Sequence, residues 1–272
     1  MIPISSFFDL LVGELEVNPN LRHYYKFLED PSPAVYNFRK RYFCQRLEYI
    51  QKSIQSKDAE IFDCGCGYGT TAIFLVLNGH HVNGNTLEFY YDQIPSRIEY
   101  WSRFGDLSGL KIEHTDLFDY RPAKKFDYII AQDTLHHLEP IGDALKILSD
   151  LLVPGGRLIS IEENGDCLIN RFKNYIRRGN KLVIEVYDER TKKTFLLGNE
   201  NLRSLKQWKE LFSKAGIETN QQTAEYIRVF TPFWYRLLSL SSIEKKEYAY
   251  WRKYPVLKKY FYFGVNFTGT RQ

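Results

Sequence analysis

Apolar and polar positions alternate in a regular order between about residues 59 and 163. Five short apolar runs have the length of buried strands, at residues 59–65, 80–87, 110–116, 125–133 and 157–163. Helix-like repeats separate these runs, at residues 70–79, 89–105 and 140–156, and we expect a bend near Pro95 in the second of them. Strands that alternate with helices predict a parallel sheet with helices on both faces.

The pattern changes on either side of this region. Residues 1–57 have a helical pattern interrupted by prolines, which predicts an N-terminal helical cap, and residues 58–272 then form the α/β domain. A basic, polar segment at about 164–203 and an aromatic, lysine-rich segment at about 231–263 interrupt this domain as insertions. The remaining elements are one amphipathic helix and two strands, at residues 204–216, 217–227 and 263–272.

The composition is that of an ordinary soluble globular protein, with 44% hydrophobic and 26% charged residues in a chain of 272. A net charge of +4 gives little support to nucleic-acid binding. The start of the chain carries Asp9 and Glu14 and no basic leader, and no apolar run is long enough to span a bilayer. Four cysteines without a framework spacing argue against a disulfide-stapled secreted fold, so we expect a cytoplasmic protein.

The stretch "IFDCGCGYG" at residues 61–69 follows the first predicted strand, and its glycines let a ligand approach the backbone closely. Its spacing excludes two common ligands: Thr70 stands where a dinucleotide fingerprint needs its third glycine, and no Gly-Lys-Ser/Thr of a P-loop follows. Cys64 and Cys66 lack the spacing of zinc sites and have no second pair, so we expect no metal. A strand, a glycine loop and a helix nevertheless place backbone N–H groups at the carboxyl edge of the sheet, where α/β proteins bind ligands.

The sequence "FDCGCGYG" resembles the first motif of the class I S-adenosylmethionine-dependent methyltransferases. The resemblance runs from about residue 59 to residue 163 and continues weakly to the C-terminus. It implies a Rossmann-like, doubly wound α/β fold with a mostly parallel seven-stranded sheet, an antiparallel last strand and S-adenosyl-L-methionine as cofactor. It also implies that Gly65, Cys66 and Gly67 approach the methionyl part of the cofactor. Asp63 would face the ammonium group, which a carboxylate suits.

Thr86 ends the second predicted strand, where this superfamily usually has an acid that binds the ribose hydroxyls. A Gly-x-Thr-Leu run in place of the acid is similar to the cyclopropane fatty acid synthase-like branch, which implies that Thr86 and Leu87 contact the cofactor. A threonine hydroxyl can both donate to and accept from a ribose hydroxyl. Two alternatives stay open: Glu88 supplies the missing acceptor, or Thr86 is only a β-strand former.

Three further motifs come in the family's order. The sequence "EHTDLFDY" is similar to the third motif, which implies that Asp116 accepts from the adenine amine and that Leu117 offers its backbone. The sequence "KFDYIIAQDTLHHL" is similar to the fourth strand and its loop, where Ala131 and Gln132 would flank the methionyl group. The sequence "LLVPGGRLISIEE" is similar to the family's turn into the fifth strand.

Candidate catalytic residues must lie at the carboxyl ends of the fourth and fifth strands, because an acceptor proton has to be removed there. His136 and His137 have this position, and a histidine pKa near neutrality suits a base. A purely structural histidine pair is the alternative. Glu162 and Glu163 end the fifth strand and point to opposite sides, so only one enters the cleft. We assign Glu162 to the site, with a surface salt bridge as the alternative.

Aromatic residues are concentrated in the segment 231–263, where they alternate with lysine and arginine. Such rings line small-molecule pockets. We therefore predict that this segment, through Trp234 and Tyr235, closes over a small organic acceptor together with the N-terminal helix around Tyr36 and Phe38. The alternatives are packing of the rings against the sheet and peripheral contact with a membrane.

Three classes of function remain. A small-molecule methyltransferase is favoured, because the loop Ala131-Gln132-Asp133-Thr134 lacks the Asn/Asp-Pro-Pro-aromatic run of enzymes that methylate amino groups of nucleic acids. A methyltransferase of a macromolecular or lipid-linked acceptor is the second class. In that case the basic run "KNYIRRGNK" at 173–181 would contact phosphates or an anionic membrane. The alternative is that this run is only a solvated face. A non-catalytic cofactor-binding scaffold is the third. The methylated atom (oxygen, nitrogen or carbon) and the oligomeric state stay open.

Overall fold

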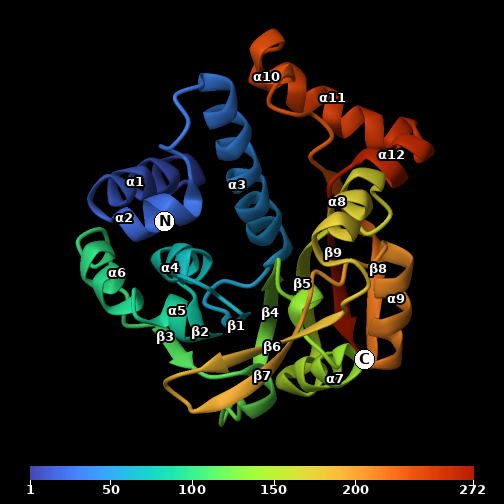
Figure 1. The fold of residues 1–272 in the computed structure, drawn as a ribbon. Helices are drawn as coiled ribbons and strands as arrows, with labels where there is room; N and C mark the ends of the chain where they lie inside the picture. Colours follow the sequence, from blue (N-terminus) through green and yellow to red (C-terminus); the bar gives the residue numbers. More distant parts are fainter.

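A computed structural model describes the chain from residue 1 to residue 272, apart from the side chains of Glu88, Phe89 and Gln221. Its largest element is a seven-stranded sheet (Figure 1). The strands of this sheet are β1 (Glu60–Cys64), β2 (His81–Thr86), β3 (Leu110–His114), β4 (Phe126–Gln132), β5 (Leu152–Glu163), β8 (Ile217–Ile227) and β9 (Gly264–Arg271).

The strands follow the order β3-β2-β1-β4-β5-β9-β8. Strands β1 to β5 pair in parallel, and β9 is antiparallel to both of its neighbours, β5 and β8. The strand order reverses between β1 and β4: β2 and β3 follow on one side of β1, and β4 and β5 on the other. Open α/β sheets bind ligands at the carboxyl ends of the strands beside such a topological switch point. This topology confirms the predicted Rossmann-like, mostly parallel seven-stranded sheet with an antiparallel last strand.

Helices from the first part of the chain cover one face of the sheet (Figure 1). They are α1 (Ile4–Val17), α2 (Pro19–Tyr25), α3 (Pro33–Ser53), α4 (Thr70–Leu77) and, after the short α5 (Glu88–Tyr91), α6 (Ile94–Trp101). Ile61, Ile130 and Ile159 of the sheet belong to the same buried cluster as Phe7 of α1 and Trp101 of α6. The N-terminal helices therefore share one hydrophobic core with the sheet.

The opposite face is covered by α7 (Ile141–Leu151), α9 (Leu205–Lys214) and the one-turn helix η1 (Leu117–Asp119). Phe62, Ile129 and Leu158 pack there with Leu145 and Phe212, and each of the three is a sequence neighbour of a residue in the first cluster. Because side chains alternate across a strand, apolar residues in succession bury both faces of the sheet.

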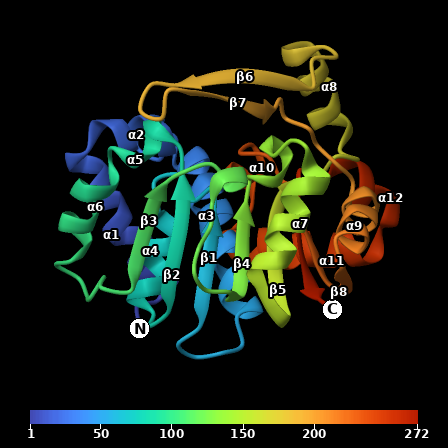
Figure 2. The ribbon, with the colours of Figure 1, turned by 90° about the horizontal axis from the view of Figure 1, so that it is seen from below.

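Both predicted insertions contain regular structure. The first has α8 (Leu168–Arg178) and the antiparallel hairpin of β6 (Val183–Asp188) and β7 (Lys193–Gly198). Figure 2 shows this hairpin crossing above the carboxyl ends of the parallel strands. At its far end Asp188 meets His114 of β3, with 2.9 Å between Oδ2 and Nε2. The second insertion has α10 (Trp234–Leu237), α11 (Leu240–Lys253) and α12 (Pro255–Phe261), and α10 packs on α3.

Two local expectations about element boundaries differ from the structure. The helix expected over residues 89–105 is divided into α5 and α6, and the break lies next to Pro95, which occupies the first turn of α6, where a missing N–H costs no hydrogen bond. Strand β5 begins at Leu152 instead of residue 157, because Leu152 already pairs with Phe126 before the register shifts. Within the described chain, no helix is both long and apolar enough to cross a membrane.

Candidate active site

The loop after β1 contains three glycines with left-handed backbone, at φ +66° for Gly65, +55° for Gly67 and +72° for Gly69. Residues with a Cβ rarely adopt this conformation. A Cβ at Gly65 would lie 2.6 Å from Cγ2 of Thr134, so this glycine lets the loop after β4 pack closely. A Cβ at Gly67 would have no atom within 4 Å. The backbone at Gly67 therefore faces open space at the carboxyl edge of the sheet.

Asn85, which the sequence analysis missed, fixes the position of this loop. Its side-chain Oδ1 accepts from the N–H of Gly65 at 3.0 Å, and its backbone carbonyl accepts from the N–H of Cys66 at 2.9 Å. Its Nδ2 donates to the carbonyl of Thr115 at 3.0 Å. One buried asparagine thus joins the ends of β1, β2 and β3. Its only sequence signal is a polar residue inside a buried strand.

Asp63 is almost fully buried at the end of β1, and its Oδ2 has no hydrogen-bond partner among the described residues. Burial raises the pKa of this carboxyl to about 7, although the N–H of Ala72 bonds to it and opposes the shift. A buried acceptor without a partner costs free energy unless a ligand satisfies it. A cationic amine is the kind of group that would do so.

The end of β2 places Thr86 and Leu87 beside the loops that follow β1 and β3. Thr86 is buried, and its carbonyl accepts from the N–H of Thr115 at 3.3 Å. Leu87 is half-buried just beyond it. The alternative acceptor, Glu88, lies outside the described side chains. Thr86 and Glu88 both stay candidates for the ribose contact.

Asp116 and Leu117 follow β3, and Gln132 ends β4. Burial raises the pKa of Asp116, while the N–H groups of Phe118 and Leu117 donate to its carboxylate and lower it. Leu117 is buried in the second core cluster. The Oε1 of Gln132 accepts from the hydroxyl of Thr71 at 3.2 Å. These residues lie at the carboxyl ends of β3 and β4, which β2 and β1 separate in the sheet.

The residues at this edge fit S-adenosylmethionine. Gly67 leaves room for the ligand, and Asp63 offers an unpartnered carboxylate oxygen to its ammonium group. Asp116 lies two strands away along the same edge, a separation that an extended nucleoside ligand requires. The contacts themselves stay predictions.

A buried ion pair connects the N-terminal helices to the glycine loop. Arg97 of α6 is fully buried and donates through Nε and Nη2 to Glu14 of α1, at 2.9 and 2.6 Å. Its Nη1 donates to the carbonyl of Tyr68 and to the hydroxyl of Thr70, both at 2.6 Å. Trp101 donates its indole N–H to the same glutamate at 2.8 Å. The sequence gives no signal of this group because its members are far apart along the chain.

His136 lies on the one-turn helix η2 (Leu135–His137) after β4, with its Nδ1 2.6 Å from Oε2 of Glu162. The other carboxylate oxygen, Oε1, accepts from the N–H groups of Leu135 and Thr134, at 2.8 and 3.2 Å. Burial opposes protonation of His136, but the Glu162 carboxylate outweighs it and raises the pKa of the imidazole to about 9. Glu162 therefore positions His136 rather than facing a ligand directly.

His137 lies beside His136, with 4.1 Å between the ring centroids and 52° between the ring planes. Its Nδ1 lies 3.0 Å from the carbonyl oxygen of Gly198 at the end of β7. Burial and the neighbouring His136 lower the pKa of His137. Glu163, the residue after Glu162, is half-buried, and burial raises its pKa. The structure thus brings His136, His137 and Glu162 together, as the sequence predicted.

A second charged group lies at the same edge and was not predicted. Arg46 of α3 pairs with Asp133 in the loop after β4, at 2.6 Å between Nη1 and Oδ2. The guanidinium groups of Arg46 and Arg228 lie 4.3 and 4.1 Å from the ring centroid of Tyr42. Asp133 and Arg228 both have left-handed backbone, at φ +51° and +65°. Such strain in residues with a Cβ is typical of functional sites.

The predicted acceptor residues are brought together only in part. The rings of Phe38 and Tyr235 meet edge to face, with 5.7 Å between centroids. Trp234 packs on Phe230 at 6.0 Å and is 42% exposed. Tyr36 instead packs on Phe8 at the edge of the first core cluster. The contact between α3 and α10 therefore rests on Phe38 and Tyr235.

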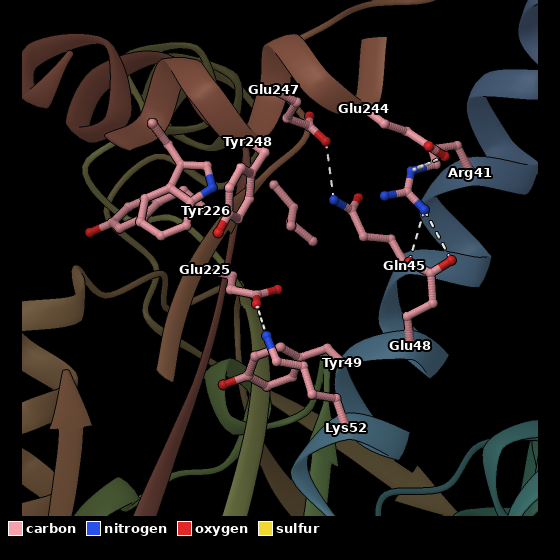
Figure 3. A pocket seen from close by; sticks show the side chains of 12 residues that line it. Arg41, Gln45, Glu48, Tyr49, Lys52, Glu225, Tyr226, Glu244, Glu247 and Tyr248 are labelled. Carbon is pink, nitrogen blue, oxygen red and sulfur yellow. Dashed lines mark hydrogen bonds and ion pairs between the residues drawn. The ribbon is translucent and has the colours of Figure 1, made fainter. Parts of the chain in front are cut away.

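A cavity of about 230 Å³ lies between α3, β8 and α11 (Figure 3). Charged pairs line it: Lys52 meets Glu225 at 2.5 Å, and Arg41 meets Glu48 at 2.9 Å. Gln45 donates to Glu247 on its far side at 3.0 Å. Lys52–Glu225 joins α3 to β8, Gln45–Glu247 joins α3 to α11, and Arg41–Glu48 lies within α3. These polar contacts suit a structural role better than a pocket for an apolar acceptor.

A family model described as a methyltransferase domain matches residues 36–222, more than half of the chain. The chain belongs to this methyltransferase family. The ubiquinone biosynthesis O-methyltransferase of Xylella fastidiosa (strain M23) is 31% identical over 118 residues, which cover 42% of the chain and 45% of that relative. The protein of the same name from Coxiella burnetii (strain Dugway 5J108-111) is 28% identical over 116 residues, covering 42% and 47%. The matched part of the chain thus spans less than half the length of these curated relatives.

Solved structures share the fold of this methyltransferase. The magnesium protoporphyrin IX methyltransferase of Synechocystis PCC 6803, with bound SAH, has a TM-score of 0.58 at 13% identity, covering 94% of the chain and 95% of the other. The 1,6-didemethyltoxoflavin-N1-methyltransferase of Burkholderia thailandensis has a TM-score of 0.53 at 12% identity, covering 100% and 92%. Such identities show the fold alone. Family and fold together confirm the predicted class, an S-adenosylmethionine-dependent methyltransferase domain.

Proposed function

We propose that the protein uses S-adenosylmethionine to methylate a small organic acceptor. The observation that carries this proposal is the pairing of open space at Gly67 with the unpartnered, buried carboxylate oxygen of Asp63. The cofactor supplies an activated methyl group, so the protein has to align the acceptor, exclude water and remove a proton where the acceptor carries one. A cytoplasmic location is part of the proposal.

The residues around the carboxyl edge support these tasks. The β6–β7 hairpin crosses above this edge, where it can limit the access of water (Figure 2). His136 and His137 both use Nδ1 in contacts with protein acceptors, so a ligand at this edge would meet Nε2 of each ring. Arg46 and Arg228 both contact the ring of Tyr42, and Arg46 pairs with Asp133 in the loop after β4. A non-catalytic scaffold would not need this array of titratable side chains.

The acceptor class is supported by the relatives' names and by one aromatic contact. The named relatives act in ubiquinone biosynthesis, on magnesium protoporphyrin IX and on 1,6-didemethyltoxoflavin. Phe38 and Tyr235 bring two rings together where α10 packs on α3. We therefore extend the proposal to an acceptor with an apolar or aromatic part.

An enzymatic screen tests this function. Purified protein, S-adenosylmethionine and fractions of a metabolite extract are combined, and release of S-adenosylhomocysteine is measured. We expect release with some fractions and none without an acceptor. The Gly67→Ala variant should show none with any fraction. Release that is equal in the variant and the wild type would contradict the assigned site.

Helix α8 supports a second proposal, peripheral contact with an anionic membrane. It buries two asparagines, Asn170 and Asn174, against the protein and turns its apolar side chains outward. These exposed side chains are Leu168, Ile169, Phe172, Tyr175 and Ile176. The basic residues of the helix are Arg171, Lys173, Arg177 and Arg178. An outward apolar face beside basic residues suits an interface with anionic lipid.

Vesicle sedimentation tests the membrane proposal. The wild-type protein should sediment with vesicles that contain phosphatidylglycerol and less with pure phosphatidylcholine. Phe172→Glu should abolish binding, and Arg177→Glu should weaken it at low salt. Val17→Glu, on an exposed apolar residue of α1, is the matched control. No sedimentation of the wild type with either vesicle would refute the membrane contact and leave the methyltransferase proposal intact.

A further inference from the structure

Three metal-ligating side chains converge where η2 meets the loop after β7. The ligand atoms of His136, His137 and Glu200 all lie within 4.8 Å of one another. We propose that they bind one divalent transition-metal ion through Nε2 of each imidazole and the Glu200 carboxylate. We expected no metal from the spacing of Cys64 and Cys66, and the sequence does not indicate this site because Glu200 is distant from the two histidines along the chain.

Hydrogen bonds fix the tautomer of both imidazoles in the form that a metal needs. The carbonyl of Gly198 can only accept, so Nδ1 of His137 carries a proton and Nε2 carries the lone pair. The Glu162 carboxylate holds two backbone N–H groups on Oε1, and its Oε2 accepts from Nδ1 of His136. In the neutral ring, Nε2 of His136 then has the lone pair. A carboxylate or carbonyl behind each imidazole is the usual support of a metal-binding histidine.

The loop that carries Glu200 is held firmly against η2. Leu138 and Leu197 form an isolated antiparallel bridge, and the N–H of Asn201 donates to the carbonyl of His136 at 3.1 Å. A Cβ at position 198 would lie 2.6 Å from that same carbonyl oxygen, so Gly198 permits the close approach. Glu200 itself has left-handed backbone at φ +55°. The three ligands are therefore brought together by backbone contacts that do not depend on an ion.

The donor set selects the kind of ion. Two imidazoles and one carboxylate suit Zn²⁺ and neighbouring divalent transition metals, whereas Mg²⁺ and Ca²⁺ prefer oxygen ligands. Nε2 of His136 and Oε2 of Glu200 are 3.9 Å apart, wider than the roughly 3.3 Å between two ligands that each lie about 2 Å from a tetrahedral ion, so the Glu200 carboxylate has to move closer to bind it. The Glu200 side chain is 42% exposed, so it can rotate toward the ion, which can enter from solvent. Three protein ligands leave a position open for another oxygen.

The open position gives the site a role that rests on the proposed methyltransferase function. A metal-bound hydroxyl oxygen loses its proton more readily, because the ion stabilises the anion. We infer that the acceptor is a hydroxyl compound whose oxygen binds at this position. Its proton passes to solvent, and the oxygen is then ready to accept a methyl group.

Metal binding is measured on untagged protein that has been treated with a chelator and then freed of it. Zn²⁺ affinity is determined by competition with a chromophoric chelator, and Co²⁺ absorption reports the ligand geometry. We expect one Zn²⁺ per chain and a loss of at least about tenfold in affinity for Glu200→Gln and His137→Ala. His81→Ala, which removes an exposed imidazole 3.1 Å from Asp58, should bind as the wild type does. Cys44→Ser controls for thiol binding.

Two results would overturn this inference: no Zn²⁺ bound by the wild type, or unchanged affinity in both site variants. Glu200→Gln keeps the shape of a partly exposed side chain, so it should remain folded even where His137→Ala does not. Stabilisation by S-adenosylhomocysteine, measured as a shift in Tm without metal, reports the cofactor site separately. A chain that gains stability from the cofactor but binds no Zn²⁺ would refute only the metal site.

Discussion

Asp63 shows at the scale of one residue how the site and the stability of the fold are linked. Burial raises the pKa of its carboxyl to about 7, well above the value of about 3.9 in an unfolded chain. The folded state therefore binds this proton more tightly than the unfolded state does. Its contribution to stability is present below about pH 4 and is lost as pH rises through about 7.

This pKa predicts a pH-dependent cofactor affinity. An ammonium group favours the ionised carboxylate, so affinity for S-adenosylhomocysteine should rise as pH increases from about 5 to about 7, by up to about tenfold per pH unit. Calorimetric titration at constant ionic strength measures this slope. Asp63→Asn cannot ionise and should bind weakly with no slope over that range. An equal slope in the variant would assign the dependence to another group.

Gly67→Ala is predicted to lose cofactor binding while the protein stays folded. The new methyl group meets no protein atom within 4 Å, but it enters the space assigned to the ligand. Gly79→Ala is the matched control, because Gly79 also has a positive φ and open surroundings and lies outside the site. Thermal unfolding with and without S-adenosylhomocysteine compares the two. A shift in Tm that survives in Gly67→Ala and matches that of the control would remove Gly67 from the site.

At the scale of elements, the Arg97–Glu14 pair connects α1, α6 and the start of α4. Glu14→Gln leaves the Arg97 charge buried without its partner, and such a loss typically costs about 3–5 kcal/mol of unfolding free energy. Glu16→Gln, on the exposed side of the same helix, should change stability by less than about 0.5 kcal/mol. Urea unfolding of both variants gives the difference. Equal stabilities would show that this pair does not hold the elements together.

The contact between α3 and α10 is predicted to serve the acceptor. Tyr235→Ala removes the ring that meets Phe38, so turnover of an acceptor found in the extract screen should fall while affinity for S-adenosylhomocysteine stays unchanged. Tyr254→Ala, on an exposed ring after α11, is the control. If Tyr235→Ala lost cofactor affinity to the same extent as acceptor turnover, α10 would support the fold rather than the acceptor site.

The elements around the sheet were predictable because their apolar positions repeat with the period of a strand or a helix. Ile61 and Phe62, for example, face opposite sides of β1, and both are buried. Successive apolar residues in a strand therefore predict a sheet that is covered on both faces. The glycine loop was predictable from spacing. Asn85, the Arg97–Glu14 pair and Arg228 were not, because each depends on contacts between residues distant in sequence.

At the scale of the whole molecule, the candidate site spans the carboxyl edge from β3 to β5. The candidate cofactor residues lie at the ends of β1, β2 and β3 and, for Gln132, of β4, and the two histidines lie beyond β4. The hairpin of the first insertion crosses above both parts (Figure 2). The fold thus brings a cofactor site and candidate acceptor groups to one edge, which is the arrangement that a transfer between two bound molecules needs.

A crystal structure with S-adenosylhomocysteine tests this account most directly. We predict one molecule at the carboxyl edge, with its amino group beside Oδ2 of Asp63, its chain passing Gly67 and its adenine beside Asp116. The open space at Gly67 should be filled, and the carboxylate of Asp63 should gain its missing partner. A ligand bound elsewhere, for example in the charged cavity between α3 and α11, or no ligand at saturating concentration, would contradict the account.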